Sequence, residues 1–208
     1  MSRIALARIL VVAAVATDIV VLVGGATLKP GYSHTANFIS ELNATGTPWS
    51  QQIGWFGFVP LGSLIAAFLF VAAPAARVRG ASRFGYWLLF SQAIAYLSMP
   101  FAACDAGCPL EGSSSQAMHN LVGLLTYFAA GIGMVLLAFA PSLGKAARSA
   151  LALAGIAWLS LFLLMVDPAL QPSRGLLQRI AEAILCAVLV FIAWRMLRVE
   201  DAEPAAQR

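Results

Sequence analysis

Six long apolar segments are the feature that most limits what this chain can fold into. A helix needs about 20 mostly apolar residues to cross a membrane, whereas a barrel strand needs about 10 that alternate in polarity. Backbone polar groups in lipid must be paired within the segment, so we predict that each segment is a membrane-spanning helix. The segments are Ile4–Leu28, Ile53–Ala73, Phe84–Ala103, Met118–Ala140, Ala150–Val166 and Leu176–Leu197.

The composition excludes a soluble globular protein. Of 208 residues, 61% are apolar and only 11% are charged, whereas a soluble domain carries about 25% charged residues. After six spans, almost no chain is left for a nucleic-acid-binding module, and we expect no nucleic-acid partner. We predict an all-α polytopic bundle that forms one domain over residues 1–198, followed by a short polar cytoplasmic tail at residues 199–208.

Basic residues predict which side of the membrane each loop occupies. Ten of the 13 Lys and Arg residues fall on the same side once the spans are drawn. Because cytoplasmic loops carry the excess of Lys and Arg, we predict that both termini are cytoplasmic. The ten residues are Arg3, Arg8, Arg77, Arg79, Arg83, Lys145, Arg148, Arg195, Arg198 and Arg208, and the three on the outer side are Lys29, Arg174 and Arg179.

The first span has some features of a secretory signal. Arg3 and Arg8 precede an apolar core, and Ala14-Val15-Ala16 matches an A-x-A cleavage site. The apolar run continues for about ten residues beyond that site and completes a full span. We therefore expect a retained helix.

Ionisable residues gather in the outer halves of the spans. Asp18 lies about 12 Å from the outer end of the first span, and His119 opens the fourth. Asp167 closes the fifth span, while Arg179 and Glu182 lie in the first turns of the sixth. An ionisable group at the centre of a membrane span costs about 2.5–3.5 kcal/mol. This one-sided convergence indicates a polar site near the outer leaflet.

A structural explanation of the same residues stays open. Polar side chains can hold helices together, because interhelical hydrogen bonds in membranes contribute about 0.6 kcal/mol on average. Arg179 and Glu182 are three residues apart on one helix and could also neutralise each other.

The longest predicted loop, Lys29–Gln52, has a helical pattern of its own. Phe38, Ile39 and Leu42 share one helical face. We predict a short amphipathic or re-entrant outer segment between the first two spans. It would form part of the outer site, or else an interfacial cap that only closes the bundle. Its polar residues at the outer mouth would be His34, Asn37, Ser40 and Glu41.

Cys104 and Cys108 lie close together in another predicted outer loop. On an oxidising face they could form a small disulfide ring. A structural zinc site would need four protein ligands, and these thiols with His34 and His119 match no recognised spacing. We predict no metal and no cofactor, and we place Cys186 in the core of the sixth span.

Common catalytic motifs are missing. The sequence contains no G-x-S-x-G, H-E-x-x-H, P-loop or G-x-G-x-x-G. Two histidines cannot form a three-histidine zinc site. The sequence therefore leaves open whether the protein is an enzyme.

Four short stretches resemble a known family of six-span membrane proteins. They are Gly31-Tyr32-Ser33-His34 through Ile39-Ser40-Glu41-Leu42, Asp105 after the third span, His119 at the fourth, and Gly175-Leu176-Leu177-Gln178-Arg179 at the sixth. The chain resembles the bacterial and archaeal domain of unknown function 998 family over about residues 7–198. The resemblance implies a six-span fold in a bacterial-type plasma (inner) membrane.

Three functions are compatible with these patterns. The first is binding or transport of a lipid or other amphiphile, with Arg179 and His119 recognising an anionic headgroup. The second is a membrane-embedded hydrolase or transferase in which Glu41, Asp105 or His119 acts as acid or base. The third is a membrane scaffold. Membrane lipids are the expected partners, and the oligomeric state is open. The candidate residues are Asp18, His34, Asn37, Ser40, Glu41, Asp105, His119, Arg179 and Glu182.

Overall fold

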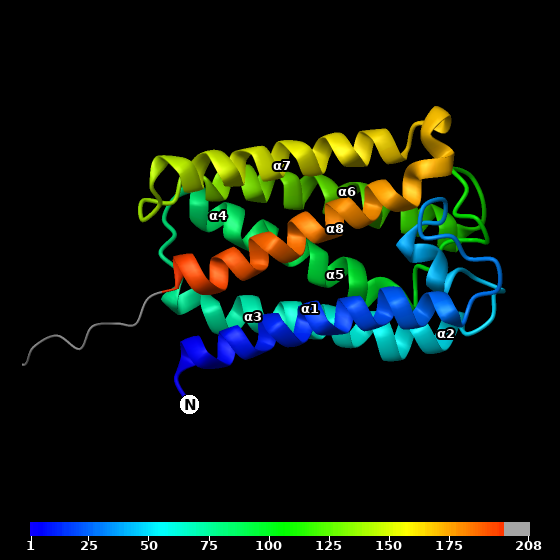
Figure 1. Ribbon diagram of the computed structural model, residues 1–208, viewed down its shortest axis with the longest axis horizontal. Helices are drawn as coiled ribbons and strands as arrows, with labels where there is room; N and C mark the ends of the chain where they lie inside the picture. Colours follow the sequence, from blue (N-terminus) through cyan, green and yellow to red (C-terminus); the bar gives the residue numbers. More distant parts are fainter. Residues whose placement is uncertain (198–208) are drawn as a thin grey trace, which may run out of the picture.

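The computed structural model describes residues 1–197, whose long helices run side by side between two ends (Figure 1). Arg198, Arg208 and the predicted tail lie outside the described residues. Apart from one bridge between Ala76 and Leu197, the described part of the chain has no β-structure. Five helical stretches are long and apolar enough to cross a membrane: Arg3–Thr27 (α1), Ser50–Ala75, Ser114–Leu137 (α6), Lys145–Met165 (α7) and Pro168–Met196.

The third predicted span, Phe84–Ala103, is the one missing from these five stretches, and it is divided at Leu89. Helices α4 (Ala81–Leu88) and α5 (Phe90–Ser98) flank this residue, which keeps right-handed helical dihedrals. The Leu89 amide donates to Tyr86, and the Gln92 amide donates to Leu89, so both bonds are of the tighter i→i+3 type. The prediction of an all-α, multi-pass bundle is confirmed.

Two of the long stretches change helix type along their length. The stretch Ser50–Ala75 contains α2 (Ser50–Ile53), a π-helix η2 (Gly54–Phe58), α3 (Val59–Ala72) and a 3₁₀ turn η3 (Ala73–Ala75). Pro60 cannot donate a backbone hydrogen bond and its ring crowds the preceding turn, which the wider π-helix accommodates. The last stretch contains η4 (Pro168–Ser173), α8 (Arg174–Phe191) and a π-helix η5 (Ile192–Met196).

Glycines bring three of the helices into close contact. A Cβ atom on Gly133 of α6 would lie 2.8 Å from the carbonyl oxygen of Gly85 in α4. On the other side of α6, a Cβ atom on Gly155 of α7 would lie 2.6 Å from the carbonyl oxygen of Gly131. Small residues at such positions let helix backbones approach within a membrane. Steric fit therefore places α4 and α7 against α6.

The loops separate into two groups. Residues 28–49, 99–113 and 166–173 gather at one end of the molecule, which we call the crown (Figure 1). The N-terminus, the α3–α4 and α6–α7 connections and the end of α8 lie at the other end (Figure 1). These opposite segments carry most of the basic residues predicted to be cytoplasmic. The orientation of the two ends in a membrane stays a prediction.

The predicted outer segment is a 3₁₀ helix, η1 (Ile39–Asn43), rather than an α-helix on the surface. All five of its residues are buried. It contacts α1, α2 and α8, so it packs among the helix ends as a re-entrant segment would. Ser40, Glu41 and the side-chain nitrogen of Asn43 bond to protein groups, which offsets part of the cost of burial.

Candidate functional site

Two cavities lie inside the helix bundle. The larger, which we call the crown cavity, has a volume of about 70 Å³ and lies between η1, α5, α6 and α8. The smaller, which we call the inner cavity, has a volume of about 10 Å³ and lies between α1, α3, α5 and α8. A cavity of the larger size has room for a few water molecules or a small polar group. Among the described residues, no Lys or Arg lines either cavity.

Tyr96 and Glu182 line both cavities. The hydroxyl group of Tyr96 donates to Oε2 of Glu182 at 2.5 Å, and both residues are buried. The bond joins α5 to α8. It also satisfies one oxygen of a carboxyl group that would otherwise be costly inside a membrane bundle.

The crown cavity has an unusual concentration of polar groups for the interior of a membrane protein. Gln178 accepts a hydrogen bond from the Ile39 amide at 2.6 Å, and Gln92 donates to the Thr126 carbonyl at 3.0 Å. Unlike the side chains of Gln178 and Gln92, the buried hydroxyl of Tyr127 has no hydrogen-bond partner among the described residues. Since unpaired buried polar atoms are rare, this hydroxyl marks a place where a ligand or water would bind.

His119 lies at the crown end of the cavity. Its Nδ1 atom is 2.9 Å from the Ala102 carbonyl oxygen, which can only accept, so Nδ1 carries the proton. A neutral imidazole then keeps a lone pair on Nε2. Ser40 lines the same cavity, with its hydroxyl 3.4 Å from Sγ of Cys108.

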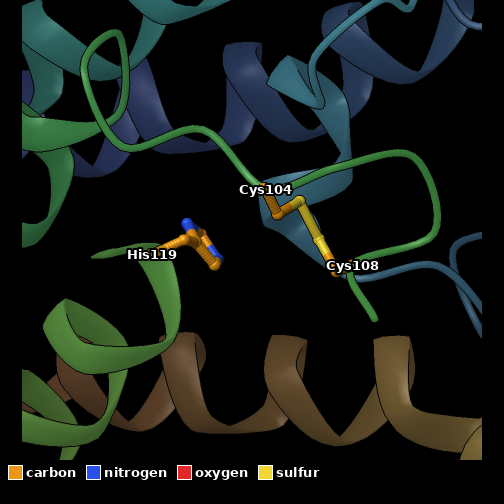
Figure 2. Close-up of side chains that lie close together, drawn as sticks. All are labelled: Cys104, Cys108 and His119. Atoms are coloured by element: carbon orange, nitrogen blue, oxygen red, sulfur yellow. A yellow bond between two sulfur atoms is a disulfide. The ribbon is translucent and has the colours of Figure 1, made fainter. Parts of the chain in front are cut away.

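Cys104 and Cys108 form a disulfide beside His119 (Figure 2). Their Cα atoms are 5.1 Å apart, within the normal range for a bridge. Both cysteines are buried together with Ala44, and Phe38 packs against them. In this form the two sulfurs are bonded to each other, and residues 105–107 form the short loop that connects the two cysteines.

Glu41 forms an ion pair with Arg174, which the sequence did not single out as a site residue. Arg174 Nη2 lies 2.9 Å from Glu41 Oε1, and both side chains are largely buried. Glu41 also accepts hydrogen bonds from the Phe38 amide and the Asn37 side chain, each at 2.8 Å. The guanidinium group lies 4.4 Å from the centre of the Phe38 ring. No local signal in the sequence indicates this partner, because the two residues are 133 positions apart.

Arg179 holds the chain before η1 against α8. Its guanidinium group donates to the carbonyl oxygens of Asn37 and Gly175, at 3.1 and 2.9 Å, and to the Tyr32 hydroxyl at 2.6 Å. Burial raises the pKa of Tyr32, whose hydroxyl donates in turn to the Phe38 carbonyl at 2.9 Å. Arg179 does not pair with Glu182, so the pairing considered from their spacing does not form. The Glu182 side chain bonds to Tyr96 instead.

The other predicted residues lie outside the crown cavity. His34 is exposed and packs edge-to-face on Tyr32. Asp105 lies in the loop before α6 and accepts hydrogen bonds from the Ser113 amide, the Ser113 hydroxyl and the Thr45 hydroxyl. The bonds from Ser113 hold the pKa of Asp105 below its ordinary value. Asp18 lines the inner cavity, where its Oδ2 is 3.8 Å from Sγ of Cys186.

The structure thus divides the predicted outer site into separate groups. The crown cavity brings together Ser40, His119 and Glu182. The ion pair of Glu41 with Arg174 and the contacts of Arg179 with Asn37 brace the crown instead. Tyr127, Tyr96 and Gln178 were missed, because uncharged residues within or at the start of apolar spans resemble ordinary core positions.

Comparison with known proteins supports the resemblance seen in the sequence. Residues 11–195 match the model of a family described as Protein of unknown function (DUF998). No curated protein and no solved structure matches the chain. The match covers nearly all of the helix bundle, including both cavities. The chain is therefore a multi-pass membrane protein that belongs to the domain of unknown function 998 family.

Proposed function

We propose that the protein binds the polar end of an uncharged, lipid-like amphiphile in the crown cavity, in a bacterial-type plasma membrane. The unpartnered Tyr127 hydroxyl carries this proposal, because it stands at a cavity within an apolar helix bundle. An unsatisfied buried polar group costs about 1–3 kcal/mol. A ligand hydroxyl or carbonyl group at this position would remove that cost.

The lining of the cavity suits a molecule with one polar and one apolar part. Ser40, His119 and Gln178 provide groups that donate or accept hydrogen bonds. Phe58, Met99 and Val122 provide apolar surface on the same cavity. Ligand sites commonly combine an apolar wall with a few polar groups that fix orientation.

The charges around the cavity favour an uncharged polar end over the anionic headgroup considered from the sequence. Arg179 donates to three oxygen atoms of the protein and does not line the cavity. Arg174 is paired with Glu41. Glu182 is the carboxylic acid that lines the cavity, and it would repel a phosphate or carboxylate in its ionised form.

Filling the cavity provides the test. A Cβ atom added to Gly123, which lines the cavity, meets no atom within 4 Å, so Gly123→Leu can extend into space without a backbone clash. Gly24 of α1 has the same freedom and lines neither cavity, which makes Gly24→Leu the matched control. Native mass spectrometry after mild extraction should detect a co-purifying lipid on the wild type and on Gly24→Leu. The lipid should be lost from Gly123→Leu.

Tyr127→Phe adds a second measurement that leaves the cavity volume almost unchanged. We expect it to reduce lipid occupancy by about tenfold, because one hydrogen bond to the ligand of about 1.5 kcal/mol is lost. Equal lipid occupancy in wild type, Gly123→Leu and Tyr127→Phe would contradict binding in the crown cavity. A co-purifying lipid with a phosphate headgroup, displaced by Gly123→Leu, would contradict the uncharged ligand.

A further inference from the structure

Two sulfur atoms and one imidazole meet at the crown end of the bundle. Cys104, Cys108 and His119 each offer a ligand atom, and these atoms lie within 4.8 Å of one another. Figure 2 shows the imidazole ring of His119 to one side of the disulfide, on a different segment from the loop that carries the cysteines. His119 comes from α6, and the cysteines come from the loop that precedes it. This is a short, local arrangement that needs no rearrangement of the helices.

The hydrogen bond of His119 prepares its ring for a metal ion. Nδ1 donates to the Ala102 carbonyl oxygen at 2.9 Å, which leaves the Nε2 lone pair free. Metal-binding histidines almost always donate their other ring N–H to a carbonyl or carboxylate oxygen in this way. The bond fixes both the tautomer and the orientation of the ring. No other described group bonds to the His119 ring.

We propose that the reduced form of the protein binds a divalent zinc ion through Cys104, Cys108 and His119. Zinc binds thiolate sulfur at about 2.3 Å and imidazole nitrogen at about 2.0–2.1 Å, so two sulfur ligands of a tetrahedral ion stand about 3.8 Å apart. Once the disulfide is broken the two sulfurs can separate to this distance, and the His119 ring already offers a nitrogen within 4.8 Å of them. A water molecule or the Ser40 hydroxyl, which is 3.4 Å from Cys108 Sγ, completes four-coordination.

The disulfide makes this site depend on redox state. In the oxidised form each sulfur is bonded to the other and cannot act as a thiolate ligand. A dithiol reductant breaks the S–S bond by supplying two electrons and two protons, and is itself converted to a disulfide. Two thiols form, and zinc binding then releases their two protons to the solvent. The crown is thus held by a disulfide in one state and by a metal ion in the other.

Cobalt provides a spectroscopic probe of this site. Purified protein in detergent is reduced with a phosphine, which takes oxygen from water to become a phosphine oxide and leaves two thiols. After the phosphine is removed under anaerobic conditions, Co²⁺ is added. We expect about one ion per chain, with thiolate-to-cobalt charge transfer in the near ultraviolet and the visible bands of a tetrahedral ion. Zn²⁺ should displace these bands, and the oxidised protein should not produce them.

Matched variants identify the ligands. Replacing a ligand, by Cys104→Ser, Cys108→Ser or His119→Ala, should weaken Co²⁺ binding more than about tenfold. The chain offers a control of each type. Cys186 lies in α8 and is the free cysteine, and His34 is exposed. Cys186→Ser and His34→Ala should retain one Co²⁺ per chain with unchanged spectra.

Three results would overturn the proposal. They are equal binding by oxidised and reduced wild type, thiolate bands that persist in the Cys104→Ser, Cys108→Ser double variant, and absence of binding by a reduced wild type that keeps its helical circular dichroism. A reduced protein that loses its helical signal would also overturn it, because the folded dithiol site would not exist. Metal binding is measured without any added lipid. A failure of the metal proposal would therefore leave the proposal of lipid binding in the crown cavity unaffected.

Discussion

The Tyr96 hydroxyl donates a hydrogen bond to Glu182 at 2.5 Å, and both residues line the two cavities of the bundle. The only other tyrosine on the crown cavity, Tyr127, has no hydrogen-bond partner among the described residues. The same residue type therefore has two roles within one cavity. Tyr96 satisfies a buried acid, whereas Tyr127 offers an unused hydroxyl.

Removing each hydroxyl in turn should separate the two roles. Tyr96→Phe leaves a Glu182 oxygen unpaired, and we expect it to lower the free energy of unfolding by about 1–3 kcal/mol. Tyr127→Phe removes an unpaired buried hydroxyl, so after bound lipid is removed it should leave stability unchanged or raise it by up to about 1–3 kcal/mol. Denaturant unfolding in detergent, followed by circular dichroism, measures both. Equal destabilisation by the two variants would contradict this assignment.

The ion pair of Arg174 with Glu41 should be the main polar support of η1. Removing one partner of a buried pair leaves the other charge unpaired, which costs about 3–5 kcal/mol. We expect Arg174→Ala and Glu41→Ala each to reduce stability on this scale, and the double variant to lose less than the sum. Thermal unfolding provides the measurement, with the exposed Arg83→Ala as the control. Additive losses would show that the two side chains act separately.

Close packing of α4 on α6 should require glycine at position 133. A Cβ atom on Gly133 would crowd the Gly85 carbonyl oxygen at 2.8 Å, so Gly133→Ala should lower the unfolding free energy by about 1–3 kcal/mol. Gly24 faces open space, and Gly24→Ala should leave stability unchanged or raise it by up to about 1 kcal/mol. In a thermal unfolding assay, Gly133→Ala should therefore lower the unfolding temperature, whereas Gly24→Ala should leave it unchanged or raise it. A stabilising Gly133→Ala would refute the close packing of α4 on α6.

Asp105 should make the crown sensitive to acid. Hydrogen bonds from Ser113 hold its pKa below the ordinary value of 3.8. A group with a lowered pKa in the folded state stabilises the fold above its ordinary pKa, and this contribution is lost as the pH falls through the lowered value. Between neutral pH and about pH 3, wild type should lose more thermal stability than Asp105→Asn. Parallel pH profiles for the two proteins would count against this role for Asp105.

The distribution of basic residues predicts that both termini face the cytoplasm. Green fluorescent protein fused after residue 208 should fluoresce, and alkaline phosphatase fused there should be inactive. A phosphatase inserted between Ala106 and Gly107, in the crown, should be active. Opposite reporter activities would mean that the protein has the reverse orientation in the membrane, with the disulfide on the reducing side.

The local elements of the fold were largely accessible from the sequence. Each apolar run is long enough to span the membrane, and Ser2 and Ser113 cap α1 and α6 as hydroxyl side chains commonly do. The interruption at Leu89 was not accessible, because Leu is a good helix former and no proline lies beside it. The outer segment was only partly predictable. Its helical spacing was visible, but its burial depends on Gln178 and Arg174, which lie more than a hundred residues away.

Hydropathy and charge act locally along the chain, so the order of residues was enough to predict a membrane-spanning helical bundle and the loops that share a side. Which polar side chains meet depends on how the helices pack against one another. Close packing at Gly131 and Gly133 fixes the rotation of α6, and Tyr127 of this helix then faces the same cavity as Glu182 of α8. Arg179 and Glu182 are three residues apart on one helix, yet they bond to different partners, Tyr32 and Tyr96. Side-chain direction in a bundle depends on neighbouring helices, and no local pattern contains that information.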